Sequence, residues 1–594
     1  MKKLNKIIIL FVVFMFIVPA TSFLSTVSSA NNVSSNNTAL TVALVSSGPV
    51  VTMNPLYPSG QSAILSSQLT GIMYLSLLQQ APNGTLEPQL ASSWSVNHNA
   101  TSFTFNLRPN LKWSDGLPLN ASNVAYTFSL FVNSSLLDSF NGFEVGPLIK
   151  SMDVVNQTTI IFTLKHSFAP FLEYAGLGKV IVPETQFSKV SNLTSYSNSG
   201  SPVGDGPYVL ENWTPGSSIL RFYANPNFYL GAPKLSVIDV EILTSDSTIP
   251  SLLSSGSITM AQPAPSQLAS LKGVANISTS ISPGDSIFGT YFDPACLLMY
   301  NNELYPYNVT AVKQALAYAI NRTEIVSLGL SGQGSVGSQS QLPTSLGSSI
   351  SPNVPNYKYN PDKAAAILTS LGFKKNSNGY FEFSNGTLWQ PTILNTGGVE
   401  SSVASIIVLN LKAAGIDANQ ETITTGSLVS ALEYGNFNML ILQTSRPPLP
   451  SFVLGVFACN QTIPTGSAEL NYHGWTRWTN STFINDLDSA LLTGNSTQQL
   501  QYYYNAEEIA GTQLPLITLA YGNAIWAYSN SDIHGWELAK AGYQFPQSNL
   551  LFDLHGSVSA AKPVDYLGII ISVVIVAAIL GGVFVYWKRK QDKD

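Results

Sequence analysis

Residues 308–322 read NVTAVKQALAYAINR, and this stretch indicates how the second half of the chain folds. Val309, Val312, Leu316, Ala319 and Ile320 recur at the spacing that places them on one face of an α-helix. Such an apolar face has to be buried against another element. The stretch therefore predicts a helix that packs on a sheet or on other helices.

The segments that follow alternate between helix and strand signals. Asn360-Pro361-Asp362 supplies an N-cap, a proline at the first helical position and an early acid, and Gly372 follows the expected helix end. The sequence NLKAAG (410–415) is typical of a helix end, and IDANQETI (416–423) is strand-like. Alternating strands and helices predict an α/β fold.

The first half of the chain carries mainly strand patterns. Residues 40–45 (LTVALV) alternate weakly, residues 103–107 alternate strictly, and residues 160–164 repeat the pattern more weakly. Residues 207–213 and 217–223 flank Thr214-Pro215-Gly216, which predicts a hairpin. The region from about 31 to 560 is too long for one hydrophobic core, so we expect two or three domains.

The first thirty residues follow the pattern of a secretory signal. Lysines at 2, 3 and 6 precede the apolar run 7–18, and small polar residues lead to Ser28-Ser29-Ala30. We expect a signal peptide over 1–30. No cysteine follows it, so a lipid-modified N-terminus is not expected.

The C-terminal end carries the pattern of a transmembrane helix. Residues 567–587 (LGIIISVVIVAAILGGVFVYW) contain no charge, and about 20 such residues span a bilayer core. The basic residues 588–590 follow at once, which marks the cytoplasmic side. We expect a single-pass membrane protein with an extracellular ectodomain, a short linker (556–566) and a cytoplasmic tail (588–594). A buried core helix is the less favoured interpretation of 567–587.

Charge is scarce and mostly negative. Charged residues make up 10% of the chain, against about 25% in a typical soluble domain, while hydrophobic residues reach 45%. Outside the leader and tail the chain has 20 basic and 31 acidic residues, a net charge near −11, which is a poor match for nucleic acid. Sparse charge also suits an acidic exterior, because fewer ion pairs are lost when carboxylates become protonated.

Neutral polar residues fill the surface instead, and they create about sixteen Asn-x-Ser/Thr sites. In a secreted chain these are potential glycan acceptors. The candidates are Asn83, Asn99, Asn120, Asn156, Asn212, Asn385 and Asn480. Cys296 and Cys459 are the only cysteines, and outside the cell a disulfide between them is allowed, as are two buried thiols.

Enzymatic and cofactor motifs are weak. Gly332–Gly337 fits GxGxxG but neither follows a strand nor opens a helix, and Gly284-Asp285-Ser286 has no histidine-containing partner block. The five histidines are scattered, and no metal-ligand spacing occurs. We therefore expect a protein that is not an enzyme and has no cofactor.

Seven segments resemble, in order, the extracellular solute-binding proteins of oligopeptide/dipeptide-type ABC importers (family 5). Asn321 stands where that family usually has aspartate. The matching segments are 52–56 (TMNPL), 86–94 (LEPQLASSW), 103–119 (FTFNLRPNLKWSDGLPL), 202–210 (PVGDGPYVL), 225–233, 312–326 and 508–520.

The resemblance implies a bilobed receptor with an inserted subdomain, which closes around a solute and delivers it to a permease pair. The first lobe would comprise 38–70, 203–287 and 511–555, the inserted subdomain 71–202, and the second lobe 288–510. A C-terminal anchor is similar to the archaeal versions of such receptors, which bind oligosaccharides as well as peptides. An ectodomain that acts as a monomer is expected.

The resemblance also suggests ligand contacts. Peptide binders of this family grip the peptide amino terminus with an acid near a W-x-x-D-Y segment, and the equivalent 441–452 (ILQTSRPPLPSF) holds Gln443 and Arg446 but no acid. Amide and guanidinium donors suit hydroxyls or a carboxylate. Further candidates are Asn54 in the early turn and Trp475, Trp478 and Trp526, whose rings could pack on sugars, with a structural packing role as the alternative.

These features favour an oligosaccharide receptor of an ABC importer. An oligopeptide or dipeptide receptor of the same importer class is the alternative. A secreted hydrolase or an adhesive surface protein is a different class that the ordered motifs disfavour.

Overall fold

The computed structural model describes residues 39–556 except 47, 58–62, 82–84, 140–143, 283–293, 343, 446–449, 456–463, 468–473, 494 and 541–544. Residues Ala39–His555 form one compact unit. The expected signal peptide, transmembrane helix and tail lie outside the described residues. Within the described part, every helix is too short or too polar to cross a membrane.

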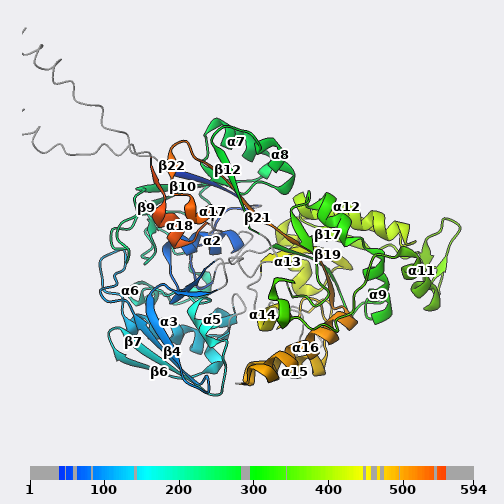
Figure 1. Ribbon diagram of the computed structural model, residues 1–594, viewed down its shortest axis with the longest axis horizontal. Helices are drawn as coiled ribbons and strands as arrows, with labels where there is room; N and C mark the ends of the chain where they lie inside the picture. The colour runs from blue at the N-terminus through cyan, green and yellow to red at the C-terminus, as the bar shows by residue number, and fades with distance from the viewer. Residues whose placement is uncertain are drawn as a thin grey trace, which may run out of the picture. The chain divides into compact units, whose positions relative to one another are not determined.

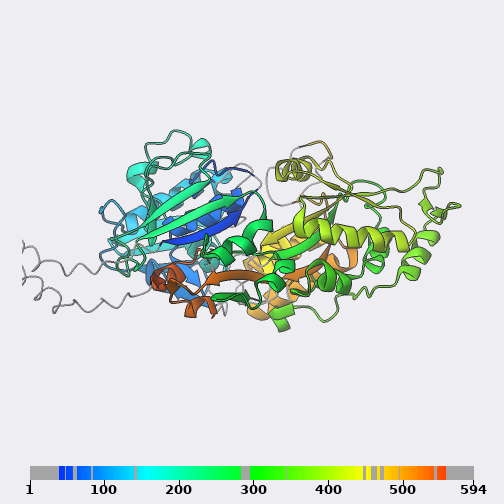
Figure 2. The same cartoon turned by 90° about the horizontal axis from the view of Figure 1, so that it is seen from above.

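The first sheet has seven strands in the order β12-β21-β11-β1-β10-β9-β8. β1 runs parallel to both of its neighbours, β10 and β11 (Figure 2). β8 and β9 are antiparallel, which confirms the hairpin predicted around 214–216. The strands are β1 (Leu40–Val45), β8 (Tyr208–Leu210), β9 (Ile219–Ala224), β10 (Val237–Leu243), β11 (Met260–Ala261), β12 (Ile277–Ser282) and β21 (Ala524–Ser529).

Short helices and a glycine turn accompany this sheet. Gly204 and Gly206 approach the end of α2 so closely that a Cβ on either would lie 2.3 Å from a backbone oxygen, so both positions require glycine. The helices are α2 (Ala63–Met73), α7 (Ile249–Ser255), α8 (Leu268–Leu271), α17 (Glu537–Lys540) and α18 (Ser548–Asp553), with 3₁₀ turns η4 (Asp246–Thr248) and η5 (Pro265–Gln267). Two further strands are β22 (Ile533–His534) and β23 (His555–Gly556).

Residues between α2 and β8 build a separate antiparallel sheet, in the order β4-β5-β7-β6, beside α3 (Figure 1). Its core is aromatic: Phe105, Phe128 and Phe171 surround Phe162 at ring distances of 4.7–5.8 Å. The strands are β4 (Ala91–Val96), β5 (Ser102–Leu107), β6 (Ile149–Asn156) and β7 (Thr159–Leu164), while β2 (Leu78–Gln80) and β3 (Leu86–Pro88) form a two-stranded sheet of their own. The helices are α3 (Ala121–Asn133), α4 (Ser135–Ser139), α5 (Phe171–Gly176) and α6 (Glu184–Phe187), with η2 (Gly146–Leu148) and η3 (Leu193–Ser195).

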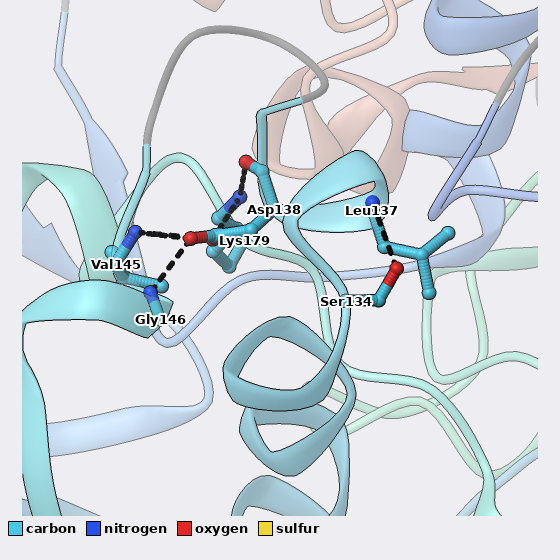
Figure 3. A network of polar contacts seen from close by, with 6 residues as sticks. All are labelled: Ser134, Leu137, Asp138, Val145, Gly146 and Lys179. Atoms are coloured by element: carbon cyan, nitrogen blue, oxygen red, sulfur yellow. Dashed lines mark hydrogen bonds and ion pairs between the residues drawn. The ribbon is translucent and has the colours of Figure 1, made fainter.

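A buried ion pair closes one end of this subdomain (Figure 3). Lys179 Nζ lies 3.1 Å from the Asp138 carboxylate, and the two side chains are 3% and 1% exposed. The backbone N–H groups of Val145 and Gly146 also donate to that carboxylate. Burial lowers the pKa of Lys179, and the Asp138 charge acts in the opposite direction.

The other large sheet has six strands in the order β14-β20-β13-β19-β17-β18. β17 runs parallel to both of its neighbours, and β13 is antiparallel to both β19 and β20. The strands are β13 (Pro294–Tyr300), β14 (Gly334–Val336), β17 (Thr392–Asn395), β18 (Asn419–Thr422), β19 (Met439–Ser445) and β20 (Leu516–Gly522). β15 (Lys374–Lys375) and β16 (Phe381–Glu382) form a small hairpin.

Helices accompany both faces of this sheet, and α12 lies beside β17 in Figure 1. α9 confirms the helix predicted at 308–322, with Val312, Leu316 and Ala319 fully buried. The helices are α9 (Thr310–Ala319), α10 (Arg322–Glu324), α11 (Pro361–Ser370), α12 (Gly398–Ala413), α13 (Thr425–Tyr434), α14 (Pro450–Gly455), α15 (Ser481–Leu492) and α16 (Ser496–Gln513), with the π-helical turn η6 (Ile325–Gly329) and η7 (Thr344–Ser349).

One of the connections by which the chain passes between the two large sheets is a single residue. β20 belongs to the six-stranded sheet and β21 to the seven-stranded sheet, and Asn523 alone separates them. The first-lobe segment expected to begin at 511 therefore begins after Gly522, because β20 pairs with β13 and β14. The other strands of the seven-stranded sheet lie within 38–70 and 203–287.

Candidate functional site

The order of β18, β17 and β19 creates a topological switch point. The chain leaves β17 through α12 to reach β18 on one side, then returns through α13 to β19 on the other side of β17. In open α/β sheets, ligands bind outside the carboxyl ends of the strands at such a point. This edge of the six-stranded sheet is therefore the candidate site.

The crossover links this edge to the equivalent edge of the first sheet. β20 runs in the same direction as β19, so Gly522 ends at the carboxyl edge that Ser445 also reaches. β21 is antiparallel to β11, so Ala524 begins at the carboxyl edge of the seven-stranded sheet. The Asn523 crossover thus connects the carboxyl edge of one sheet to that of the other. This connection is compatible with a solute site to which both sheets contribute.

The residues at the ends of these strands are uncharged where the structure describes them. In the seven-stranded sheet, β1, β10 and β11 are followed by Ser46, Thr244 and Gln262. In the six-stranded sheet, β17 and β18 end at Asn395 and Thr422, and Asn523 follows β20. Hydroxyl and amide groups can both donate and accept hydrogen bonds. The Asn395 amide is fully buried and bonded to Gly397, Glu421 and Thr422, so the neutral polar chemistry of the edges comes from the other strand-end residues.

Gln443 lies at this edge, two residues before β19 ends, and its side chain is exposed. Its backbone N–H donates to Glu400 Oε1 at 3.2 Å, which sequence reasoning did not anticipate. Glu400 is 6% exposed, and its other oxygen accepts the Thr396 N–H and hydroxyl at 2.8 and 2.7 Å. The acid therefore ties the start of α12 to β19. Arg446 lies outside the described residues.

Asn54 is placed as a turn-forming residue. Its side chain is fully buried, Nδ2 donates to the Leu193 carbonyl at 2.6 Å, and Oδ1 accepts from the Leu56 N–H at 3.0 Å. These contacts fix the segment that follows β1 against η3. They use the amide within the chain, so a structural role accounts for Asn54.

Two of the three candidate tryptophans are core residues. Trp478 is 5% exposed, donates from Nε1 to Gln513 Oε1 at 3.1 Å and packs edge-on against Phe483. Trp526, in β21, is 3% exposed and packs against Phe545 in the core of the seven-stranded sheet. For both rings the structure therefore fits the alternative given above, a structural packing role.

Trp475 is the half-buried tryptophan of the three. It packs against the cluster that contains Leu297, Leu432 and Tyr521, as do Leu394 of β17 and Leu442 of β19. Leu442 and Gln443 are consecutive in a strand and so point to opposite sheet faces. Trp475 packs on the face opposite Gln443. The carbonyl of the next residue, Thr476, accepts the N–H of Asn302 at the end of β13, which places this segment at the amino edge of β19 and β20 and not at the carboxyl edge. The structure therefore does not bring Trp475 together with Gln443.

The remaining candidate residues lie elsewhere. Cys296 is a buried, free thiol in β13, and burial raises its pKa, while Cys459 lies outside the described residues. Asn83 also lies outside them. Asn99, Asn156, Asn212 and Asn385 are exposed. Asn120 and Asn480 are partly buried N-caps of α3 and α15, and each side-chain oxygen accepts a backbone N–H.

Two α/β sheets joined by a single-residue crossover, with a switch point at the carboxyl edge of one of them, have the architecture of a bilobed binding protein. The family described as bacterial extracellular solute-binding proteins, family 5 Middle, matches residues 85–462. The chain belongs to this family, which makes it a substrate-binding protein of an ABC importer.

Curated relatives cover most of the chain. The dipeptide-binding protein of Escherichia coli is 23% identical over 83% of this chain and 91% of its own length. Heme-binding protein A of Haemophilus influenzae is 24% identical over 84% of this chain and 89% of its own length.

Solved structures share the fold. NikZ from Campylobacter jejuni, in complex with Ni(L-His), is 24% identical with a TM-score of 0.73, covering 87% of this chain and 99% of that chain. A Thermotoga maritima oligopeptide-binding protein bound to mannohexaose is 21% identical with a TM-score of 0.72, covering 88% and 99%. Relatives with this fold are thus known with chemically different ligands.

Proposed function

We propose that this protein is a membrane-tethered extracellular receptor that delivers an oligosaccharide to an ABC importer. We infer the class of solute from the uncharged residues at the strand ends of both carboxyl edges. A zwitterionic peptide calls for charged partners, whereas a polyol is recognised by hydroxyl and amide groups that donate and accept.

The state of Glu400 supports the same choice. Its carboxylate is the acid that the structure places beside Gln443, and three donors of the chain already occupy it. Removing a carboxylate from such donors to bind an ammonium group would leave buried N–H and O–H groups unpaired, which costs free energy. A peptide receptor remains the second candidate, because Glu400 is a negative charge near the site.

The mechanism follows from binding and closure rather than chemistry. A solute held by both carboxyl edges stabilises the closed arrangement of two lobes that rotate about short crossovers such as Asn523. The relatives named above are binding proteins, in keeping with a receptor that is not an enzyme. A transmembrane anchor at 567–587 keeps the receptor at high local concentration near its permease.

Tryptophan fluorescence and calorimetry of the full-length chain in detergent test the solute class. The titrants are mannohexaose, maltohexaose and a neutral tetrapeptide, each at pH 4 and pH 7. We expect saturation at micromolar sugar and no response to the peptide. Saturation by the peptide alone would assign the protein to the peptide receptors and direct attention to Glu400. Microscopy with a tag at either terminus checks the predicted topology.

A further inference from the structure

β16 is followed by a tight turn with the sequence FSNGT, residues 383–387 (the 383–387 turn). The Gly386 N–H donates to the Phe383 carbonyl, and the Phe383 N–H donates to the Thr387 carbonyl, both at 2.8 Å. Gly386 has a φ of +81°. These bonds describe a type I turn closed by a left-handed glycine, a common way to connect two antiparallel strands. The backbone bonds thus fix the conformation of the turn.

Asn385 lies in this turn with an exposed side chain. Its Oδ1 accepts the Thr387 N–H at 3.0 Å, and the described residues supply no hydrogen-bond partner for Nδ2. Asn385-Gly386-Thr387 has the Asn-x-Ser/Thr pattern of an acceptor for N-linked glycans, which are attached at Nδ2. The turn therefore holds the amide oxygen and leaves the reactive nitrogen accessible.

A partly exposed group of aromatic rings lies beside Asn385. Phe383 is opposite Thr387 in the hairpin, and opposite residues project from the same face. The Phe383 ring is half-buried, with its centre 5.5 Å from that of Tyr305, which is 58% exposed. Phe373 lies 5.6 Å from Phe383 and is stacked with Tyr305 at 6.4 Å. The rings form an aromatic surface next to the acceptor.

A sugar attached to Asn385 is the occupant that this surface fits. The apolar face of a pyranose packs on an aromatic ring while its hydroxyl groups stay in water. Attachment two residues from Phe383 holds the first sugar beside the ring at a high local concentration. Asn480 also follows an aromatic residue by two positions, but Trp478 is 5% exposed and the Asn480 oxygen caps α15. The aromatic surface and the accessible amide coincide at Asn385.

We infer that Asn385 carries an N-linked glycan whose first sugar packs on Phe383 and Tyr305 and stabilises the 383–387 turn. The donor is a lipid-linked saccharide that a membrane oligosaccharyltransferase presents. A bond forms between Asn385 Nδ2 and sugar C1, the bond from C1 to the phosphate oxygen breaks, the lipid phosphate leaves with the electron pair, and the amide loses one proton. The inference rests on the extracellular location in the proposed function and is independent of the solute.

Glycopeptide mass spectrometry of the full-length chain, purified from the cells that make it, tests the modification. The peptide containing Asn385 should carry the mass of a saccharide. Thr387→Ser keeps the acceptor pattern and should keep the saccharide. Thr387→Val removes the required hydroxyl but retains Asn385 and the backbone N–H that bonds its oxygen, so it should lose the saccharide.

An unmodified Asn385 in the wild type would overturn the inference. The other Asn-x-Ser/Thr sites of the chain then show where the error lies. If the extracellular location is wrong, the saccharide is missing from all of them. If only the assignment to Asn385 is wrong, some of the others carry it.

Hydrogen exchange at the Phe383 and Gly386 amides tests the packing, because both N–H groups close the turn. In protein from the same cells, exchange should be about fivefold slower in Thr387→Ser than in Thr387→Val, since the packed sugar opposes local opening. The same two variants made in a host without N-glycosylation measure the effect of the substitution alone. There the difference should be less than about twofold.

Removal of the rings completes the test. In a Phe383→Leu background the fivefold difference between Thr387→Ser and Thr387→Val should fall below about twofold, because the glycan loses its packing surface. Tyr305→Leu, at the more exposed ring, should reduce the difference in the same direction without disturbing the core. An equal exchange rate in the two glycosylation variants, or a difference that survives in both ring variants, would overturn the packing contact.

Discussion

Two buried lysines, one in the inserted subdomain and one beside the six-stranded sheet, have different kinds of partner. Lys179 and Lys313 are both 3% exposed. Lys179 lies against the Asp138 carboxylate and over the Phe131 ring, 4.3 Å from its centre. Lys313 donates to a neutral amide, Asn302, and burial lowers its pKa to about 7. Among the described residues, no carboxylate lies within ion-pair distance of Lys313.

The two buried lysines therefore have different structural roles. In the inserted subdomain, charge pairing and two backbone donors lock α4 to the residues that follow it, so the pair contributes to a single packed state. Beside the six-stranded sheet, the lysine can lose its proton and still orient the Asn302 amide, which bonds the Thr476 and Pro515 carbonyls. The first arrangement pairs two charges, and the second uses the lysine as a hydrogen-bond donor that does not have to be charged.

Asp138→Asn should produce the largest effect. The variant leaves the buried Lys179 ammonium without its counter-charge, and breaking a buried pair in this way costs about 3–5 kcal/mol of unfolding free energy. Urea unfolding of the full-length chain at pH 6, followed by tryptophan fluorescence, measures the loss. Asp153→Asn is the control, because Asp153 is exposed on β6 of the same subdomain. Equal effects of the two variants would remove the stabilising role of the pair.

Glu507→Gln should change how stability depends on pH. Glu507 is fully buried in α16, accepts the Ser351 N–H with one oxygen, and burial raises its pKa to about 8. A carboxyl whose pKa is raised on folding contributes stability that is present below its ordinary pKa of about 4.5 and is lost as the pH rises toward 8. One such group contributes a slope of up to about 1.4 kcal/mol per pH unit.

The wild type should therefore lose stability between pH 4.5 and 8, and Glu507→Gln should flatten that decline. Urea midpoints at pH 4.5, 6 and 8 measure the slope. Glu421→Gln, at an exposed residue of β18, serves as the control. A wild-type slope that survives in Glu507→Gln would show that another group titrates over this interval.

Lys313→Met should have a smaller effect with the opposite sign. Between pH 7 and the ordinary lysine pKa of 10.5, the unfolded chain binds a proton that the folded chain does not, so stability rises with pH. The Met variant should lose this rise. At pH 8 it should lose no more than about 1 kcal/mol of unfolding free energy from the missing donor to the Asn302 oxygen, and removal of the lysine deprotonation penalty acts in the stabilising direction. A loss as large as that of Asp138→Asn would contradict the comparison of the two lysines.

Local sequence patterns predicted the regular elements well. Asn360 caps α11 by accepting the Lys363 N–H, with Pro361 at the first helical position, as the sequence indicated. The alternation of residues 103–107 matches β5, whose Phe103, Phe105 and Leu107 are buried. Each of these signals acts within a few residues, where steric and hydrogen-bonding rules decide the conformation.

The boundary between β20 and β21 could not be predicted in the same way. All thirteen residues of the two strands are buried, so the run from 516 to 529 has no alternation that would mark a change of sheet. Only pairing with distant strands assigns one strand to each sheet. The resemblance to a family indicated that the chain returns to the first lobe, but not the residue where it does so.

The site was predictable only in part for a related reason. Gln443 was identified from its place in the chain, and the structure puts it at the candidate edge, whereas the segment that holds Trp475 lies at the opposite edge of the sheet. Glu400 was missed because its importance depends on its bond with Gln443, which lies 43 residues away in sequence. A long-range contact of this kind leaves no periodic signal in the sequence.

Arg221→Gln should give the smallest effect and complete the comparison of charge pairs. Arg221 and Asp239 face each other across β9 and β10 and form two hydrogen bonds of 2.7 and 2.8 Å, so the geometry is as good as that of the buried pair. The arginine side chain is 56% exposed, however, and solvent screens the attraction. The thermal midpoint should fall slightly at low salt and match the wild type in 1 M NaCl, where the screening length is about 3 Å. A loss that persists in 1 M NaCl would mean that Arg221 stabilises the sheet through packing of its aliphatic stem rather than through its charge.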